Sequence, residues 1–257
     1  MKMFLVMKIL QKCCLLLFFP VSLFASEADS ALSRAERYYR QNDFSKAIVE
    51  YQTLTDGGWK SAELFYNLGN ACFKNHDIKS AILYYERAKR LAPNDESINE
   101  NLKLSYRLIF DKVEAIPEHF LAVWGKSVRD SMSLSQWSRW SIGCFVAMLA
   151  LMLVFFFVRK IAVRKFAFWL AAFCLIFTIT AFVFAFLQKA NIERTDEAIV
   201  FTPSVTIKSS PDDSGNNLFV LHEGIKVSIE YRIDQWYNIR IADGRKGWIR
   251  VTDLKVI

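Results

Sequence analysis

Tyr66-Asn-Leu-Gly-Asn-Ala-Cys-Phe73, followed by Leu83-Tyr-Tyr-Glu-Arg-Ala-Lys-Arg-Leu-Ala-Pro-Asn-Asp95, decides the fold of the first third of this chain. Both stretches lie in residues 62–95, and residues 28–61 align with them without a gap, so the repeat period is 34 residues. The aligned pairs include Ala47 with Ala81 and Tyr51 with Tyr85. A period of this length predicts pairs of antiparallel helices that stack on one another.

The second copy resembles the tetratricopeptide repeat family, because Gly69, Ala81 and Pro93 stand where that family has small residues and a helix stop. The resemblance implies an all-α tetratricopeptide repeat domain over residues 26–110. Its repeats are residues 28–61 and 62–95, and residues 96–108 form a capping helix. Asn42 and His76 fall at the tight turns, where a positive φ is expected.

The resemblance also implies a concave groove, lined by the first helix of each pair, that binds extended peptides or partner domains. Matching positions give the candidate groove residues Leu32, Glu36, Tyr39, Arg40, Tyr66, Asn70, Phe73 and Lys74. The alternative is that these side chains only pack the stack or meet water. A clamp for a terminal carboxylate is not expected, because Glu36 has the wrong charge.

The basic residues are unevenly placed. The net charge is +7, and seven basic residues gather in two clusters, Lys2, Lys8 and Lys12 and then Arg159, Lys160, Arg164 and Lys165. The other 26 basic residues balance the 26 acidic ones. The excess charge therefore indicates membrane topology, and a nucleic-acid-binding stripe is excluded as the main interpretation.

Two uncharged apolar runs predict a two-helix transmembrane hairpin, with spans at 140–158 and 166–187. The connecting loop, 159–165, carries four positive charges and should be cytoplasmic. Both flanking regions are then periplasmic in a bacterial inner membrane. The spans contain no Asp, Glu, Lys, Arg or His, which argues against a transporter or channel.

Residues 1–25 have a basic start and a short apolar core, which predicts a secretory signal peptide; an uncleaved anchor is the alternative. The linker 111–139 contains Phe120, Leu121 and Trp124 at helical spacing, with Lys126 and Arg129 on the other face. This helix either lies in the membrane interface or packs against the repeats. A second linker covers residues 188–197.

Residues 198–257 alternate apolar and polar side chains, as in Ile225–Tyr231, and Gly-rich turns separate the runs. Five short strands, forming a small all-β barrel, are expected. Val205–Pro211, Leu221–Gly224 and Asp243–Ile249 resemble the bacterial SH3-like family, whose members bind peptides or cell-wall material or brace neighbouring domains. Trp236 and Trp248 are candidate cleft residues, although core packing is expected for at least one of them.

Taken together, this multidomain membrane protein resembles the BatE family of Bacteroides aerotolerance operons, on the strength of Tyr66–Phe73, Leu83–Asp95 and Ile207–Gly215. The resemblance implies protein partners, namely membrane proteins with von Willebrand A domains and a MoxR-type ATPase. No catalytic, metal or cofactor motif is recognised, and His76, His119 and His222 are isolated in the sequence. We expect a non-enzymatic scaffold; the alternative is a cell-wall tether or an accessory to envelope enzymes.

Overall fold

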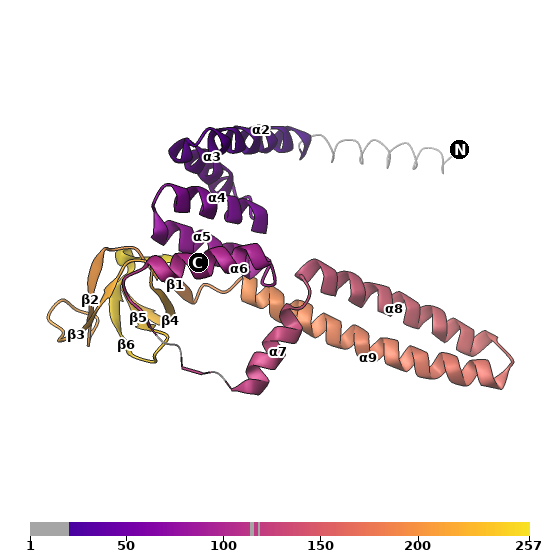
Figure 1. Ribbon diagram of the computed structural model, residues 1–257. Coiled ribbons are helices and arrows are strands. Elements are labelled where there is room, and N and C mark those ends of the chain that lie inside the picture. The colour runs from indigo at the N-terminus through magenta and orange to yellow at the C-terminus, as the bar shows by residue number, and fades with distance from the viewer. Residues whose placement is uncertain (1–20, 114–115, 118) are drawn as a thin grey trace, which may run out of the picture.

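A computed structural model describes residues 21–113, 116–117 and 119–257. It consists of a stack of helices, a long helical hairpin that projects from it, and a β domain that lies beside the stack (Figure 1). Most of the expected signal peptide, residues 1–25, lies outside the described residues.

The repeat region is a series of antiparallel helices. Their bounds are α2 Val21–Arg40, α3 Phe44–Asp56, α4 Ala62–Lys74, α5 Ile78–Leu91 and α6 Glu96–Leu108. The first pair is α2 with α3, the second is α4 with α5, and α6 covers the end of the stack (Figure 1).

Side-chain caps begin these helices. Asp43, Ser61, Asp77 and Asp95 each accept a hydrogen bond from the backbone N–H three residues later, which satisfies a donor that the helix itself leaves free. The turns within the repeats use left-handed residues, with φ of 60° at Asn42 and 62° at His76. This agrees with the sequence expectation, since Asn and His tolerate that conformation better than most residues.

Small residues allow the paired helices to approach closely. Ala35, Ala47 and Ala81 are fully buried, and the larger Tyr51 and Tyr85 are almost fully buried. These side chains belong to one apolar cluster that runs through the whole stack and reaches Leu102 of α6. The sequence periodicity therefore corresponds to a continuous core, as expected of stacked repeats.

Two helices of the hairpin, α8 Leu134–Phe157 and α9 Ile161–Ile192, are long and apolar enough to cross a membrane, judged by length and composition. α8 begins six residues before the expected span start at 140, and α9 extends past both ends of 166–187. Ser133 starts α8 with a capping box to Gln136. The chain reverses at residues 158–160, so part of the basic segment 159–165 is helical.

The C-terminal part is one antiparallel sheet with strand order β3-β2-β6-β5-β4-β1-β7. The strands are β1 Glu197–Val200, β2 Ser204–Lys208, β3 Asn217–His222, β4 Lys226–Ile233, β5 Trp236–Arg240, β6 Lys246–Arg250 and β7 Leu254–Val256. The expectation of five strands was wrong, because β1 and β7 are too short to show a clear alternation. The sheet is also open, since β3 and β7 stand at opposite ends of the order.

The sheet curls around an aliphatic core. Ile207 of β2, Ile239 of β5 and Val200 of β1 are all fully buried and belong to one cluster, although several strands separate β2 from β1. Only a strongly bent sheet brings these side chains together. The fold is therefore barrel-like in its packing but is not closed by hydrogen bonds.

The β domain docks on α5 and α6, which the sequence did not predict. Ile199 and Ile257 belong to the apolar cluster of the repeats. Beside them, the Lys226 ammonium lies 3.0 Å from the Glu86 carboxylate of α5 and 2.9 Å from Glu197 of β1. The Tyr106 hydroxyl of α6 donates to the other oxygen of Glu86 at 2.7 Å. The two domains therefore share core and ion pairs.

Candidate protein-binding groove

The helical stack is hollowed on the face formed by α2 and α4. A cavity of about 250 Å³ lies there, and its lining residues are Glu36, Tyr39, Arg40, Tyr51, Asn67 and Asn70. Glu36, Tyr39, Arg40 and Asn70 were expected in the groove from the sequence. We refer to this cavity as the α2–α4 groove.

Each helix contributes a different chemistry to the α2–α4 groove. Glu36 and Arg40 are exposed, and they stand one turn apart on α2, so the rim carries both charges. Tyr39 is half-buried, and its ring packs edge-on against Phe44 with centroids 5.4 Å apart. The groove therefore offers an aromatic wall, two amides and a rim of mixed charge.

Burial keeps the tyrosine hydroxyls of the groove in their neutral form. Desolvation raises the pKa of Tyr51 to about 12, with the nearby Glu36 adding to the effect. Desolvation also raises the pKa of Tyr39. A phenol is already neutral at pH 7, so burial extends into alkaline solution the range in which both hydroxyls can donate a hydrogen bond.

Next to this groove, the expected residues Tyr66 and Asn70 are bonded within the protein. The Asn101 amide of α6 donates to the Tyr66 hydroxyl at 3.1 Å and to the Asn70 Oδ1 at 3.0 Å. The Tyr85 hydroxyl donates to the same Asn70 oxygen at 2.7 Å. These bonds connect α4 to α6, so the Tyr66 hydroxyl and the Asn70 Oδ1 stabilise the stack of helices.

The other expected groove residues lie apart. Leu32 lines a different cavity, of about 180 Å³, together with Leu54 and Trp59. Phe73 is half-buried and packs against the repeat core, and Lys74 is exposed at the end of α4. The sequence thus placed eight residues on one face, and the structure brings four of them into one cavity.

Three residues of this region were missed. In the sequence Tyr51 is marked only by its alignment with Tyr85, and the repeat pattern marks neither Asn67 nor Asn101 as a groove position. Asn67 follows Tyr66 on α4, one residue outside the positions taken from the family pattern. Asn101 could have been predicted from its position, because it lies on the first helix after the second repeat, where residues that face the groove recur.

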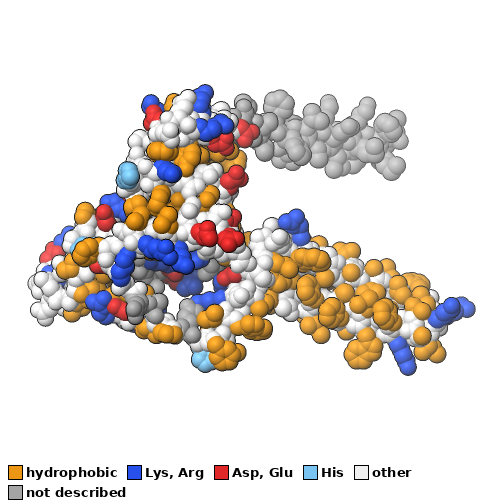
Figure 2. Space-filling view, viewed as in Figure 1, with side chains coloured by type: hydrophobic (Ala, Val, Ile, Leu, Met, Phe, Trp, Pro, Cys, Tyr) orange, Lys and Arg blue, Asp and Glu red, His pale blue; other side chains and the backbone are white. Residues whose placement is uncertain are grey.

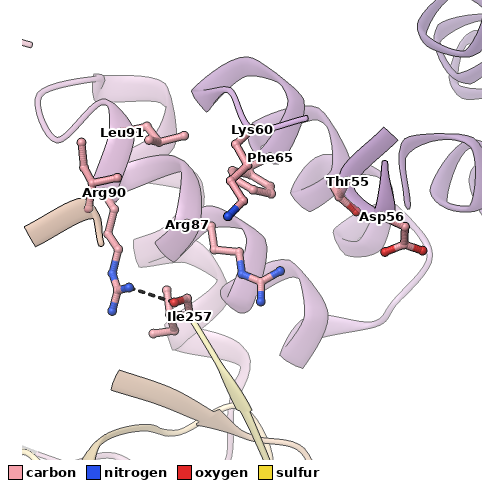
Figure 3. A pocket seen from close by; sticks show the side chains of 9 residues that line it. Thr55, Asp56, Lys60, Phe65, Arg87, Arg90, Leu91 and Ile257 are labelled. Carbon is pink, nitrogen blue, oxygen red and sulfur yellow. Dashed lines mark hydrogen bonds between the residues drawn. The ribbon is translucent and has the colours of Figure 1, made fainter. Parts of the chain in front are cut away.

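A second cavity, of about 260 Å³, lies where α5 meets the end of β7 (Figure 3). Arg87 and Arg90 point into it from α5, and Lys60 faces them. Arg87 donates to the Val256 carbonyl at 2.7 Å, and Arg90 donates to the Ile257 carbonyl at 2.8 Å. Because these guanidinium groups already bind backbone oxygens of the β domain, we interpret this cavity as part of the domain joint.

The largest of these hollows, of about 610 Å³, is a cleft between the α4–α5 turn and β3. His76, His222 and Glu223 line it. The backbone N–H of His222 donates to Asp111 at 2.7 Å, and its ring Nδ1 lies 3.0 Å from the same carboxylate. This contact ties the segment after α6 to the β domain. Across residues 21–113, 116–117 and 119–257, no three His, Cys, Asp or Glu side chains gather as metal ligands.

Trp236 and Trp248 lie on the outer face of the sheet. In the β5–β6 ladder, Trp236 pairs with Arg250 and Trp248 pairs with Asn238, so these side chains share one face. The aliphatic core, including Ile239 and Ile249, lies on the other face. Trp248 is nevertheless buried, because the Tyr231 ring packs edge-on against it at 5.3 Å. Trp248 is thus packed and buried, as expected for one of the two tryptophans, although it lies on the face opposite the aliphatic cluster.

Comparison with known families agrees with the repeat geometry. The tetratricopeptide repeat family matches residues 62–95, which are α4, α5 and the turn that follows. Comparison with curated proteins finds no match to the chain. The chain thus contains a tetratricopeptide repeat within its helical region, and this repeat supports a role in protein–protein interaction.

Proposed function

We propose that this chain is a non-enzymatic, membrane-anchored scaffold that holds an extended segment of a partner protein in the α2–α4 groove. The observation that carries the proposal is the cavity lined by Tyr39, Tyr51, Asn67 and Asn70 on the hollow face of the repeats. It is open to solvent, and no part of the β domain lines it.

The lining suits a peptide rather than a small rigid ligand. An asparagine amide both donates and accepts, so Asn67 can pair with a peptide N–H and C=O. The half-buried ring of Tyr39 offers apolar area with little loss of conformational freedom, as in many protein interfaces, whereas Tyr51 is almost fully buried. Glu36 and Arg40 at the rim then favour a segment that carries both charges.

The hairpin is the proposed anchor. Its side chains are largely apolar and exposed along α8 and α9, and the basic residues gather at the far tip (Figure 2). Lipid tails cover such an apolar surface without hydrophobic cost, so the hairpin is proposed to span the membrane. Positively charged loops stay in the cytoplasm, so both domains, at the other end of the hairpin, are proposed to be periplasmic. A reporter active only in the cytoplasm, fused after Ile257, should be silent; activity there would refute this topology.

For the wider setting, we propose a BatE-type component of an aerotolerance complex, with von Willebrand A domain proteins and a MoxR-type ATPase as partners. The support is the order of features in the chain and the sequence resemblance. In this proposal the β domain is SH3-like and braces the repeats, which agrees with the ion pairs of Glu86 and Lys226.

Photo-crosslinking tests the groove. A benzophenone amino acid is placed at Arg40, on the exposed rim, and in a matched variant at Val49, which is exposed on α3 and does not line the groove. In intact cells, position 40 should yield a protein adduct that position 49 lacks. Adding Tyr39→Ala and Asn67→Ala should then abolish the adduct.

Equal adducts from both positions, or an adduct that survives the double substitution, would show that the partner binds elsewhere. Tyr66 and Asn70 are unsuitable targets for this test, because Asn101 bonds to both and their loss would loosen α6. Deletion of residues 198–257 is unsuitable too, since Ile199 and Ile257 belong to the repeat core.

A further inference from the structure

The helix that joins the repeats to the hairpin, α7 Phe120–Asp130, exposes an apolar face. Phe120 is 71% exposed, Leu121 58% and Trp124 67%, and none of the helix's residues is buried. At 100° per residue these three side chains fall on one side, and Lys126 and Arg129 fall on the other. Within residues 21–113, 116–117 and 119–257, nothing covers this aromatic and aliphatic stripe.

One end of α7 is held against the hairpin. The Trp137 indole of α8 donates to the Arg129 carbonyl at 2.8 Å, and the Gln188 amide of α9 donates to the Met132 carbonyl at 3.2 Å. Met132 itself packs against Trp137, Ala181 and Ala185. From this joint, α7 runs crosswise to the long axis of the hairpin (Figure 1).

The joint lies at the depth where an apolar span begins. Six residues of α8 separate Leu134 from Trp140, which is about 9 Å along a helix. The uncharged run starts at Trp140, directly after Arg139, and tryptophans favour the boundary between headgroups and acyl chains. A helix that leaves the hairpin crosswise at this height lies along the membrane surface.

We propose that α7 binds the lipid surface of the leaflet that faces the two domains, with Phe120, Leu121 and Trp124 among the upper acyl chains. The proposal rests on the membrane anchoring proposed above. Lipid is the occupant because α7 is joined to the hairpin, whose side chains are apolar and exposed, and because Lys126 and Arg129 lie on the opposite side of the helix from the stripe.

This contact would set the height of the repeat domain above the bilayer. The Asn94 side chain, in the turn between α5 and α6, donates to the Asp130 carbonyl at the end of α7. Through that bond, and through the joint to the hairpin, a membrane-bound α7 would hold the stack and its groove in a defined orientation. The expected partner segment is then one that lies close to the membrane surface.

Spin labels on the full chain test the proposal in vesicles of phosphatidylethanolamine and phosphatidylglycerol. The label is placed at Leu121→Cys, at the matched control Ala122→Cys about 100° round the same helix, and at Met152→Cys in the middle of α8, each in a background without other cysteines. The label at 121 should be more accessible to dissolved oxygen than to a water-soluble nickel chelate, and the label at 122 should be more accessible to the nickel chelate. Adding Trp124→Asp should move the label at 121 toward water.

Two results would overturn the proposal while the label at 152 still reports lipid. Equal access of the nickel chelate at 121 and 122 would place α7 in water. Protection of 121 from both reagents would mean that a protein surface, such as a second copy, covers the stripe. A label at 152 that meets the nickel chelate would instead refute the membrane anchoring itself, and the binding of α7 to lipid with it.

Discussion

The ring of Tyr85 lies directly over the Cα atom of Gly69: a Cβ atom added there would lie 2.7 Å from two ring carbons. Tyr85 is almost fully buried, and its hydroxyl is bonded to Asn70, so the ring has no room to retreat. The second repeat therefore requires a glycine at this position because a larger side chain would collide with the Tyr85 ring. The backbone conformation is not the reason, since Gly69 has ordinary helical geometry.

Gly69→Ala should destabilise the repeat domain by about 1–3 kcal/mol, because overpacking outweighs the better helix propensity of alanine. The measurement is the thermal midpoint of the full chain in detergent, followed by circular dichroism. Gly125→Ala is the matched control, since a Cβ atom there meets nothing within 4 Å. Its midpoint should stay level or rise; an equal fall in both variants would contradict the packing argument.

Lys226→Met should weaken the docking of the β domain, because it leaves the carboxylates of Glu86 and Glu197 facing each other without this cation. Complete burial would make the loss about 3–5 kcal/mol. We expect about 2 kcal/mol, as the Lys226 side chain remains 32% exposed. Urea unfolding measures the loss, and limited proteolysis between α9 and β1 shows whether the domains separate.

The control for that substitution is Lys246→Met, which removes an exposed pair to Glu230 at 2.8 Å. Exposed pairs contribute about 0–1 kcal/mol. If both variants lose the same stability, the ion pairs at the joint are ordinary surface contacts.

Acid should loosen the domain joint. Burial alone would raise the pKa of Glu197, but the charges and hydrogen bonds of Lys226 and Arg90 outweigh it and lower the pKa below the model-peptide value. A carboxyl group whose pKa is lowered in the folded state stabilises the fold at pH values above its unfolded-state pKa, which is about 4.3 for glutamate. This stability is lost as the pH falls through the folded-state pKa. The free energy of unfolding should be measured from pH 6 down to pH 3, a range of about three units around these values. It should fall less steeply in Glu197→Gln than in the unsubstituted protein.

Cys72 should be unreactive in the folded protein. It is buried in the repeat core, and desolvation raises the pKa of its thiol to about 12. At pH 8 only about one thiol in ten thousand is then the reactive thiolate. With the other four cysteines replaced by alanine, a charged disulfide reagent should label the chain only after urea is added; fast labelling without urea would mean that α4 is not packed as described.

The local structure of the repeats could be predicted from the sequence because its signals act over a few residues. Asp77 caps the helix that follows it, and His76 adopts the positive φ its place in the turn requires. The capping helix at 96–108 coincides with α6 for the same reason, since Asp95 starts it. The apolar composition that marks 140–158 and 166–187 is likewise a property of consecutive residues; α8 contains the first run up to Phe157, and α9 contains the second.

The candidate groove was predicted only in part. A repeat position specifies the face of a helix on which a side chain lies, so Tyr39 and Asn70 were found. It does not specify what faces that side chain from another helix. Asn101 and Tyr85 both donate a hydrogen bond to the same oxygen of Asn70. These bonds join α4 to α6 on one side of Asn70, and the cavity between α2 and α4 lies on the other side.

The sequence by itself thus determined the helical repeats, their caps and turns, the two apolar helices and the strand-rich end of this chain. The tertiary structure alone decided the order of the strands, the outward face of Trp236 and Trp248, and the docking of the β domain through Glu86 and Lys226. Local elements follow from the backbone preferences and side-chain spacing of neighbouring residues. Contacts such as Glu86 with Lys226, 140 residues apart, form only after every element between them is in place, and no short pattern in the chain records them.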